Sequence, residues 1–186
     1  MQGGLRRKFG LGSYAPTLDF SMELGRRFAS TSTRTSNFGM GKLTFSQRIN
    51  PSLRWHASAE IERHSARRAV FSTTRHVFRI GGDYDLNENW SASVSIGHGK
   101  GDLVSWCRLS FPEFLGTTQW LDGIFGGDWF PYQTISNTTS GHFSLLRALG
   151  PNRAMAVSAD FAKSVGTGKP HTYFNDIYSL QYIHAF

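Results

Sequence analysis

The chain has little cysteine and no long apolar segment, and both absences limit its fold class. One cysteine, Cys107, occurs among 186 residues. A lone cysteine can form neither a disulfide within the chain nor a metal site made of several thiolates. No run of residues approaches the roughly 18 apolar residues that a membrane-spanning helix requires. The sequence therefore excludes a disulfide scaffold, a cysteine-based zinc module and a bundle of spanning helices.

Acidic residues are fewer than basic ones, which gives the chain a formal net charge of +7. A basic chain often binds nucleic acid. Here the arginines are spread through the sequence, and neither a basic helix nor a known nucleic-acid motif is present. We therefore expect no nucleic-acid partner, and we expect no cofactor.

Apolar and polar side chains alternate over most of the chain, which is the period of a β-strand with two different faces. The pattern is clearest at residues 53–64. Eight strands are expected at about 16–24, 39–49, 53–64, 74–86, 90–99, 138–149, 155–162 and 178–186. All six prolines lie outside strand interiors, where proline would remove a ladder hydrogen bond.

The connections between these strands fall into two length classes. Short turns such as 50–52 and 87–89 follow the second, fourth and sixth strands, and longer connections follow the others. Alternating lengths are typical of an up-and-down meander with short turns at one end and long loops at the other. We expect an irregular lead-in at residues 1–15, one β domain at 16–186 and a long loop at about 100–137. A further hairpin in that loop would give ten strands.

The last strand carries Tyr178, Leu180, Tyr182, His184 and Phe186 on one face, and the sequence stops on that aromatic residue. It resembles the C-terminal strand of small bacterial outer-membrane β-barrels of the OmpA and OmpX type, with His184 as a departure. The resemblance implies a bacterial outer-membrane location, contact with outer-membrane lipid and lipopolysaccharide, and recognition by the barrel assembly machinery. Four residues would form the assembly signal: Tyr178, Leu180, Tyr182 and Phe186. No apolar signal segment opens the sequence, so we expect a mature form or the C-terminal part of a longer protein.

Alternation alone leaves two placements of the apolar face open. A closed antiparallel transmembrane β-barrel puts it outside, whereas a soluble lipocalin-like barrel puts it inside. The sorted loops and the last strand favour the membrane barrel, and so do opposite charges expected to meet on the polar face. Expected pairs are Glu60 with Arg79, His56 with Asp83, and Glu23 with Lys42, in a charged and plugged lumen.

One polar face combines His56, Ser58 and Glu60 at every second position. These residue types are the parts of a hydrolase triad, and they resemble the His, Ser and Glu of the outer-membrane lipid A deacylases. In that family the triad opens towards the outer leaflet, whereas here the three residues face the expected lumen. We therefore expect a structural network here and keep a lipid A-modifying enzyme as the alternative.

The expected outer end of the barrel carries two further candidate features. The long loop is rich in aromatic residues that suit a partner surface: Trp106, Phe111, Phe114, Trp120 and Trp129. Arg67 and Arg68 lie in a neighbouring loop, where lipopolysaccharide would present phosphates. We therefore expect a non-enzymatic barrel that presents an aromatic-rich loop for a structural, adhesion or interaction role, with an external partner that the sequence does not name.

Overall fold

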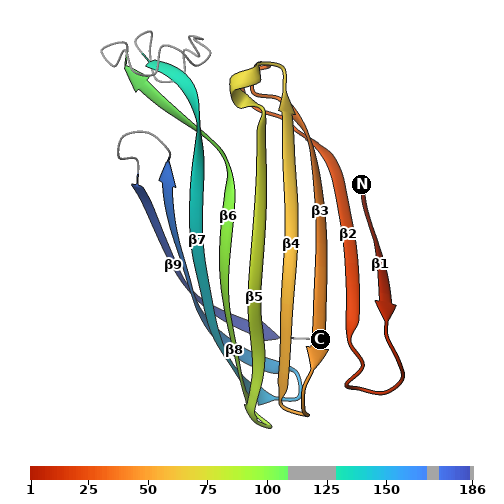
Figure 1. The fold of residues 1–186 in the computed structure, drawn as a ribbon. Coiled ribbons are helices and arrows are strands. Elements are labelled where there is room, and N and C mark those ends of the chain that lie inside the picture. The colour runs from red at the N-terminus through yellow and green to blue at the C-terminus, as the bar shows by residue number, and fades with distance from the viewer. Residues whose placement is uncertain (109–128, 167–171, 185–186) are drawn as a thin grey trace.

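The computed structural model describes residues 1–108, 129–166 and 172–184. In these residues the chain forms one antiparallel sheet of nine strands in sequence order, with a short 3-10 helix, η1 (Figure 1). The elements are β1 (Gln2–Lys8), β2 (Thr17–Arg27), β3 (Ser36–Arg48), β4 (Leu53–Ala66), η1 (Ala69–Phe71), β5 (Thr73–Asn87), β6 (Trp90–Arg108), β7 (Trp129–Gly150), β8 (Arg153–Gly166) and β9 (Thr172–His184). The expected all-β, antiparallel meander is confirmed to this extent.

Asparagine side chains build two of the short turns. Asn50 Oδ1 accepts hydrogen bonds from the backbone N–H groups of Ser52 and Leu53, at 2.9 and 2.8 Å, between β3 and β4. Asn87 Oδ1 accepts the same type of bond from Asn89 and Trp90 between β5 and β6. An asparagine that bonds to backbone groups two and three positions ahead replaces part of the turn's own backbone bonding. Both turns lie at the lower end of the sheet in Figure 1.

Strand β1 was not expected, because residues 1–15 were predicted to be irregular. Gln2–Lys8 instead pairs with β2 over seven residues, and all seven are exposed. A strand with both faces in contact with solvent needs no alternation of apolar and polar residues, so the sequence pattern gave no signal. The connection from β1 to β2 contains Gly10 and Gly12 at φ 113° and 91°, a region that residues with a side chain rarely adopt.

Strands β6 and β7 are longer than the sequence predicted. The expected loop at about 100–137 is wrong at both ends, because β6 continues to Arg108 and β7 begins at Trp129. The ladder between the two strands runs without a break from Trp90 with Arg147 to Arg108 with Trp129. Pro131 occupies a strand position here, opposite Trp106. Pairing between β6 and β7 therefore keeps residues 100–108 and 129–137 in strands, where the sequence predicted a loop.

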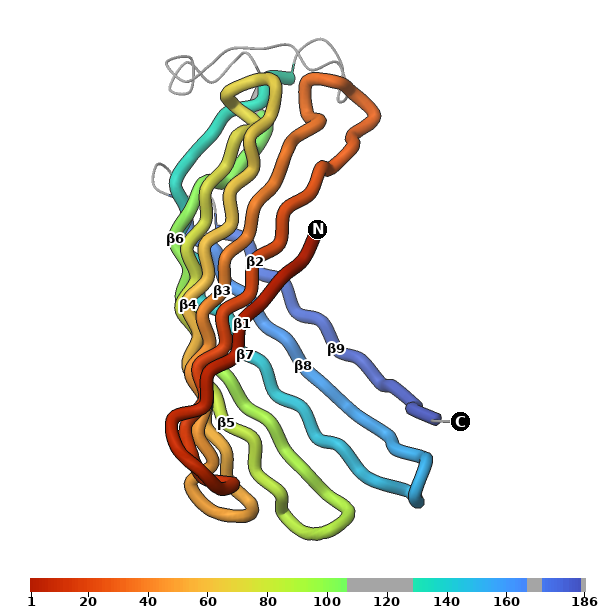
Figure 2. The backbone as a smooth tube through the Cα atoms, turned by 90° about the vertical axis from the view of Figure 1, so that its right-hand side faces the viewer, coloured from red at the N-terminus to blue at the C-terminus, as the bar shows by residue number. Residues whose placement is uncertain are grey.

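The sheet is strongly curved. Viewed from the side, β1–β5 form one arm and β7–β9 the other, and together they enclose a trough (Figure 2). Strands β1 and β9 are the two edges of the sheet in the described residues, so a closed barrel stays a prediction. Among the same residues, no helix is long and apolar enough to cross a membrane.

The two faces of the sheet differ in chemistry and in exposure. On β4 the polar row of Ser58, Glu60, Glu62 and His64 is buried or half-buried, while Ala59 and Ile61 between them are exposed. The same division holds on β5, where Phe78 and Ile80 are 55% and 45% exposed. In the described part of the chain only two hydrophobic side chains, Val70 and Tyr132, are buried. The fold therefore has no ordinary apolar core between its strands.

We predict that Gly101→Ala destabilises the fold, because β5 and β6 approach closely at this position. An added Cβ would lie 2.6 Å from the carbonyl oxygen of Thr74 and 2.7 Å from the Cα of Arg75, both backbone atoms. The free energy of unfolding should fall by about 1–3 kcal/mol, as expected for overpacking. Gly150→Ala is the matched control, because nothing lies within 4 Å of its added Cβ. Equal denaturation midpoints for the two variants would contradict this account of the strand contact.

Candidate functional site

The concave face of the sheet gathers the polar side chains, and it is the candidate functional site. Ladder partners share a face, so the register places residues from several strands in rows across the trough. One cavity of about 410 Å³ is lined from β4 to β9, with His56, Arg79, Ser95, His142 and Asp160 among its residues. Side chains from six strands can meet in this way only on the side towards which the sheet curves.

The centre of this face holds part of the network that the sequence predicted. His56 Nδ1 lies 3.9 Å from Asp83 Oδ2, so the expected neighbours are close together. Asp83 Oδ1 also accepts a hydrogen bond of 2.6 Å from the Ser93 hydroxyl on β6. Asp83 thus joins three strands, because its two oxygens face groups on either side of β5.

The other two expected charge pairs are displaced by the register. Glu60 lies directly opposite Val77 on β5 and Lys42 on β3, and Arg79 lies opposite Ser58. Glu23 lies opposite Met40, which places Lys42 on the diagonal. Arg79 is thus a diagonal neighbour of Glu60, as Lys42 is of Glu23, so the sequence identified the right face and both ion pairs stay predictions.

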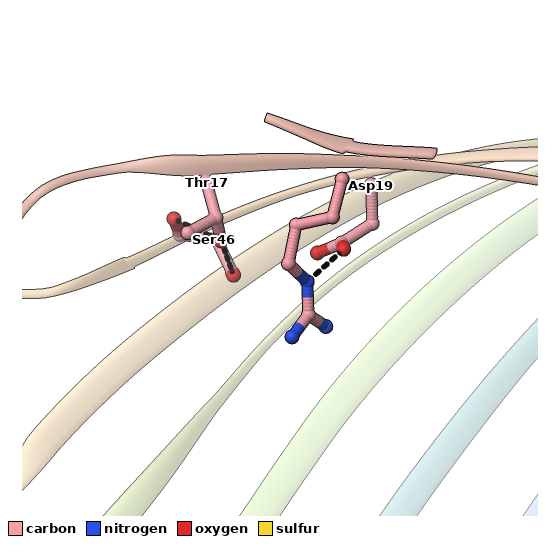
Figure 3. Close-up of polar contacts among 4 residues, drawn as sticks. Thr17, Asp19 and Ser46 are labelled. Carbon is pink, nitrogen blue, oxygen red and sulfur yellow. Dashed lines mark hydrogen bonds and ion pairs between the residues drawn. The ribbon is translucent and has the colours of Figure 1, made fainter. Parts of the chain in front are cut away.

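Hydroxyl pairs and one ion pair occupy the concave face near β1–β3 and β7–β9. Thr17 Oγ1 and Ser46 Oγ are 2.8 Å apart, and the Arg6 guanidinium contacts the Asp19 carboxylate (Figure 3). Further hydroxyl pairs at 2.7 Å join Thr138 with Ser164, and Ser158 with Ser179. All of these pairs join direct ladder partners, so each stabilises the register that brings it together.

A second charged pair on this face was missed by the sequence analysis. His142 Nδ1 on β7 lies 2.7 Å from Asp160 Oδ1 on β8. Ser95 on β6 is the ladder partner of His142, so serine, histidine and aspartate form one row. Among the hydrogen bonds of the described residues, none joins Ser95 to His142, whereas a serine nucleophile needs that bond to its base. The sequence analysis could not find this pair, because alternation shows the face on which a residue lies but not the register that makes two residues neighbours.

The predicted set of His56, Ser58 and Glu60 lies on one strand face, as expected. Ser58 is 7% exposed, and its ladder partners are Thr44 and Arg79. Within the described residues, no hydrogen bond joins any two of these three side chains, and His56 is directed to Asp83 instead. The expected structural network and the alternative catalytic role of these residues both stay predictions.

The trough has a separate polar cavity of about 340 Å³ at its upper end, lined by Arg27 on β2, Arg75 on β5 and Arg34 in the connection between β2 and β3. The Arg34 guanidinium carbon lies 5.2 Å from the Phe71 ring centroid and 4.9 Å from that of Trp106. Contacts of this kind are favourable cation–π interactions. Trp106 therefore packs against the inside of the fold's upper end, whereas the sequence had assigned it to an outward loop.

The remaining predicted residues lie at the two ends of the sheet. Arg67 and Arg68 are exposed in the connection between β4 and η1, and Trp129 is half-buried at the start of β7. Tyr178, Leu180 and Tyr182 share one face of β9 and are 75%, 69% and 61% exposed. Four predicted residues lie outside the described residues: Phe111, Phe114, Trp120 and Phe186.

Comparison with protein-family models, with curated proteins and with solved structures found no match. The chemistry of the described residues also offers no cluster of three or more His, Cys, Asp or Glu side chains that could hold a metal ion. The two faces of the sheet are therefore the features that bear on function.

We predict that Ser93 and Asp83 are energetically coupled. Ser93→Ala should lower the free energy of unfolding by about 1–2 kcal/mol, since it removes a hydrogen bond to a charged group. The same substitution in an Asp83→Ala background should have little effect, because the acceptor is already absent. A double-mutant cycle measured by chemical denaturation gives the coupling free energy. A coupling near zero would mean that the contact does not stabilise the sheet.

Proposed function

We propose that this chain is a membrane β-barrel protein whose convex face contacts lipid and whose polar face lines a plugged lumen. One observation carries the proposal: large apolar side chains form a continuous exposed band on the convex face, while the polar face is shielded. A soluble barrel would have the reverse arrangement, with the apolar row inside. The exposed band includes Phe20, Leu43, Ile61, Phe78, Ile80, Val94, Ile96, Phe143, Val157 and Phe161.

The height of this band fits a bilayer. On β4 the apolar row runs from Leu53 to Ile61, and Arg63 follows it on the same face. Nine residues lie at the short end of the roughly 9–11 residues that a tilted membrane-spanning β-strand needs. Polar residues on the same face, such as Arg26, Asn37 and Lys163, follow the apolar rows of other strands. They supply the rim that a lipid-facing surface needs.

Closure of the sheet is part of the proposal. An open strand edge leaves backbone N–H and C=O groups without partners, and each such group costs several kcal/mol in lipid. Strands β1 and β9 run in the same direction, because nine strands alternate. Closure of β9 on β2 gives eight antiparallel strands, the even number that single-chain bacterial barrels have. Strand β1 is short and fully exposed, so it is the strand most easily displaced.

The proposed location is a bacterial outer membrane, supported by the resemblance of the last strand and by the sorted connections. There the barrel assembly machinery would bind β9, whose row of Tyr178, Leu180 and Tyr182 is exposed. Arg67 and Arg68 would lie at the level of lipopolysaccharide phosphates. The contacts on the polar face favour a non-enzymatic structural, adhesion or interaction role over lipid A modification, because among the described residues no hydrogen bond joins a serine hydroxyl to His56 or His142, whose ring nitrogens face aspartates.

We predict that Ile80→Arg blocks insertion into lipid vesicles and Asn37→Arg does not. Ile80 lies near the middle of the apolar band, where arginine costs about 2–4 kcal/mol, whereas the penalty at the rim is about 0–1 kcal/mol. Insertion is measured by the heat-dependent shift in gel mobility of refolded protein, boiled against unboiled. If both variants remain folded in buffer without detergent, the convex face is not a lipid-facing surface.

We predict that backbone amides along all of β9, Thr172–His184, exchange slowly in the inserted protein. In an open sheet, the amides on the free edge of β9 would exchange rapidly, while those bonded to β8 would be protected. In the eight-stranded barrel, both sets are protected and the amides of Gln2–Lys8 exchange rapidly. Protection of both β1 and β9 would instead indicate a nine-stranded barrel, and would contradict the closure on β2.

A further inference from the structure

The convex face carries a groove that no part of the described chain fills. The groove has a volume of about 590 Å³ and crosses β2 to β6. Phe20, Leu43, Ile61 and Phe78 form its apolar walls. Between them lie Gly41, which has no side chain, and Ala59, which has only a methyl group, so the surface is recessed there.

Glycine at position 41 is not required by the backbone. An added Cβ would meet only the Ile61 Cγ2, at an ordinary contact distance of 3.6 Å. The backbone φ angle of Gly41 is also not positive, so the backbone conformation does not require glycine. A larger side chain could therefore be accommodated there, and it would project into the groove. The groove exists because of the residue at this position, not because of a constraint of the strand.

Basic side chains border the groove on its β5–β6 side. His76 and Lys100 are ladder partners on β5 and β6, and His98 is the partner of Phe78. All three are exposed on the convex face. Lys42 and Glu60, which also border the groove, are ladder partners of each other on the opposite face, so their charges offset. Lys100 therefore gives the border of the groove on the convex face a positive charge, and the two histidines add polar ring nitrogens.

We propose that this groove binds one phosphate-bearing anionic lipid of the surrounding bilayer. An acyl chain lies over Gly41 and Ala59, and the phosphate contacts Lys100, His76 and His98. The inference rests on the proposed membrane placement, which turns the convex face towards lipid. Charge complementarity decides the occupant: an apolar groove bordered by a lysine and two histidines, with no acid on the same face, matches a lipid with an apolar chain and an anionic headgroup. A basic side chain near an anionic membrane surface contributes about 1 kcal/mol of attraction.

A second groove on the same face is less suited to an anionic lipid. It has a volume of about 610 Å³, and Gly141, Phe143, Phe161 and Phe174 line it. Lys163 borders it, but so does Asp176, which is the ladder partner of Phe161 on the convex face. An acid beside the single lysine weakens attraction for an anion. The first groove has several bases and no acid on its own face.

The test is native mass spectrometry of the full-length protein folded in detergent, titrated with phosphatidylglycerol or with phosphatidylcholine. The folded wild type should retain one phosphatidylglycerol in preference to phosphatidylcholine, whose headgroup has no net charge. Lys100→Gln should weaken phosphatidylglycerol binding about fivefold, the effect of one basic residue at an anionic surface. Arg26→Gln is the matched control, since Arg26 is a cation on the same face outside the groove lining.

Filling the groove tests the acyl-chain contact separately. Gly41→Leu should weaken binding of both lipids, and Ala59→Leu provides a second filling variant. Gly3→Leu is the control, because Gly3 lies on the same face with nothing within 4 Å of its added Cβ. Equal binding of both lipids by folded wild type, or equal losses in Lys100→Gln and Arg26→Gln, would overturn the site alone. A wild type without a heat-dependent gel shift would overturn the membrane placement as well.

Discussion

The constraint on which this structure depends is the shielding of polar groups on one face of a curved sheet. Curvature brings side chains from up to six strands around a single cavity, so that acids, bases and hydroxyls find partners across the trough. Asp83 illustrates the result, since one carboxylate faces both a histidine and a serine on different strands. An exposed polar face would gain little from such contacts, because water screens them.

The same curvature turns the apolar residues outward, and this leaves the fold without a core of its own. Only Val70 and Tyr132 are buried hydrophobic side chains in the described residues. Most folds bury their apolar side chains in a core between their own elements. A sheet whose apolar side chains face outward can bury them only against an apolar medium outside the chain. In the proposed function lipid is that medium, and the polar residues at which the apolar rows stop, such as Asn37 and Arg63, would then lie at the membrane surface. The proposed function thus follows from the difference between the two faces, of which one is polar and shielded and the other is apolar and exposed.

The strands with alternating residues could be predicted from the sequence, and the others could not. The sequence predicted β4 because one face of that strand is polar and shielded while the other is apolar and exposed. It did not predict β1, because both faces of that strand are exposed. The two-residue period of a strand was enough to place His56 and Asp83 on the same face of the sheet. The pairing of His142 with Asp160 could not be predicted in this way, since it depends on the register between β7 and β8. Trp106 was misassigned because glycines and a proline resemble loop signals when the partner strand is unknown.

The order of the strands has a consequence for how the protein folds. Every ladder joins strands that are neighbours in the sequence, and asparagine side chains organise the turns at residues 50 and 87. The hairpins β3–β4 and β5–β6 can therefore form with a short loop and a small loss of chain entropy. In a closed barrel, only the joining of the two edges connects distant parts of the chain. The entropic barrier is then concentrated in that last event, so open, curved sheets are the expected intermediates of assembly.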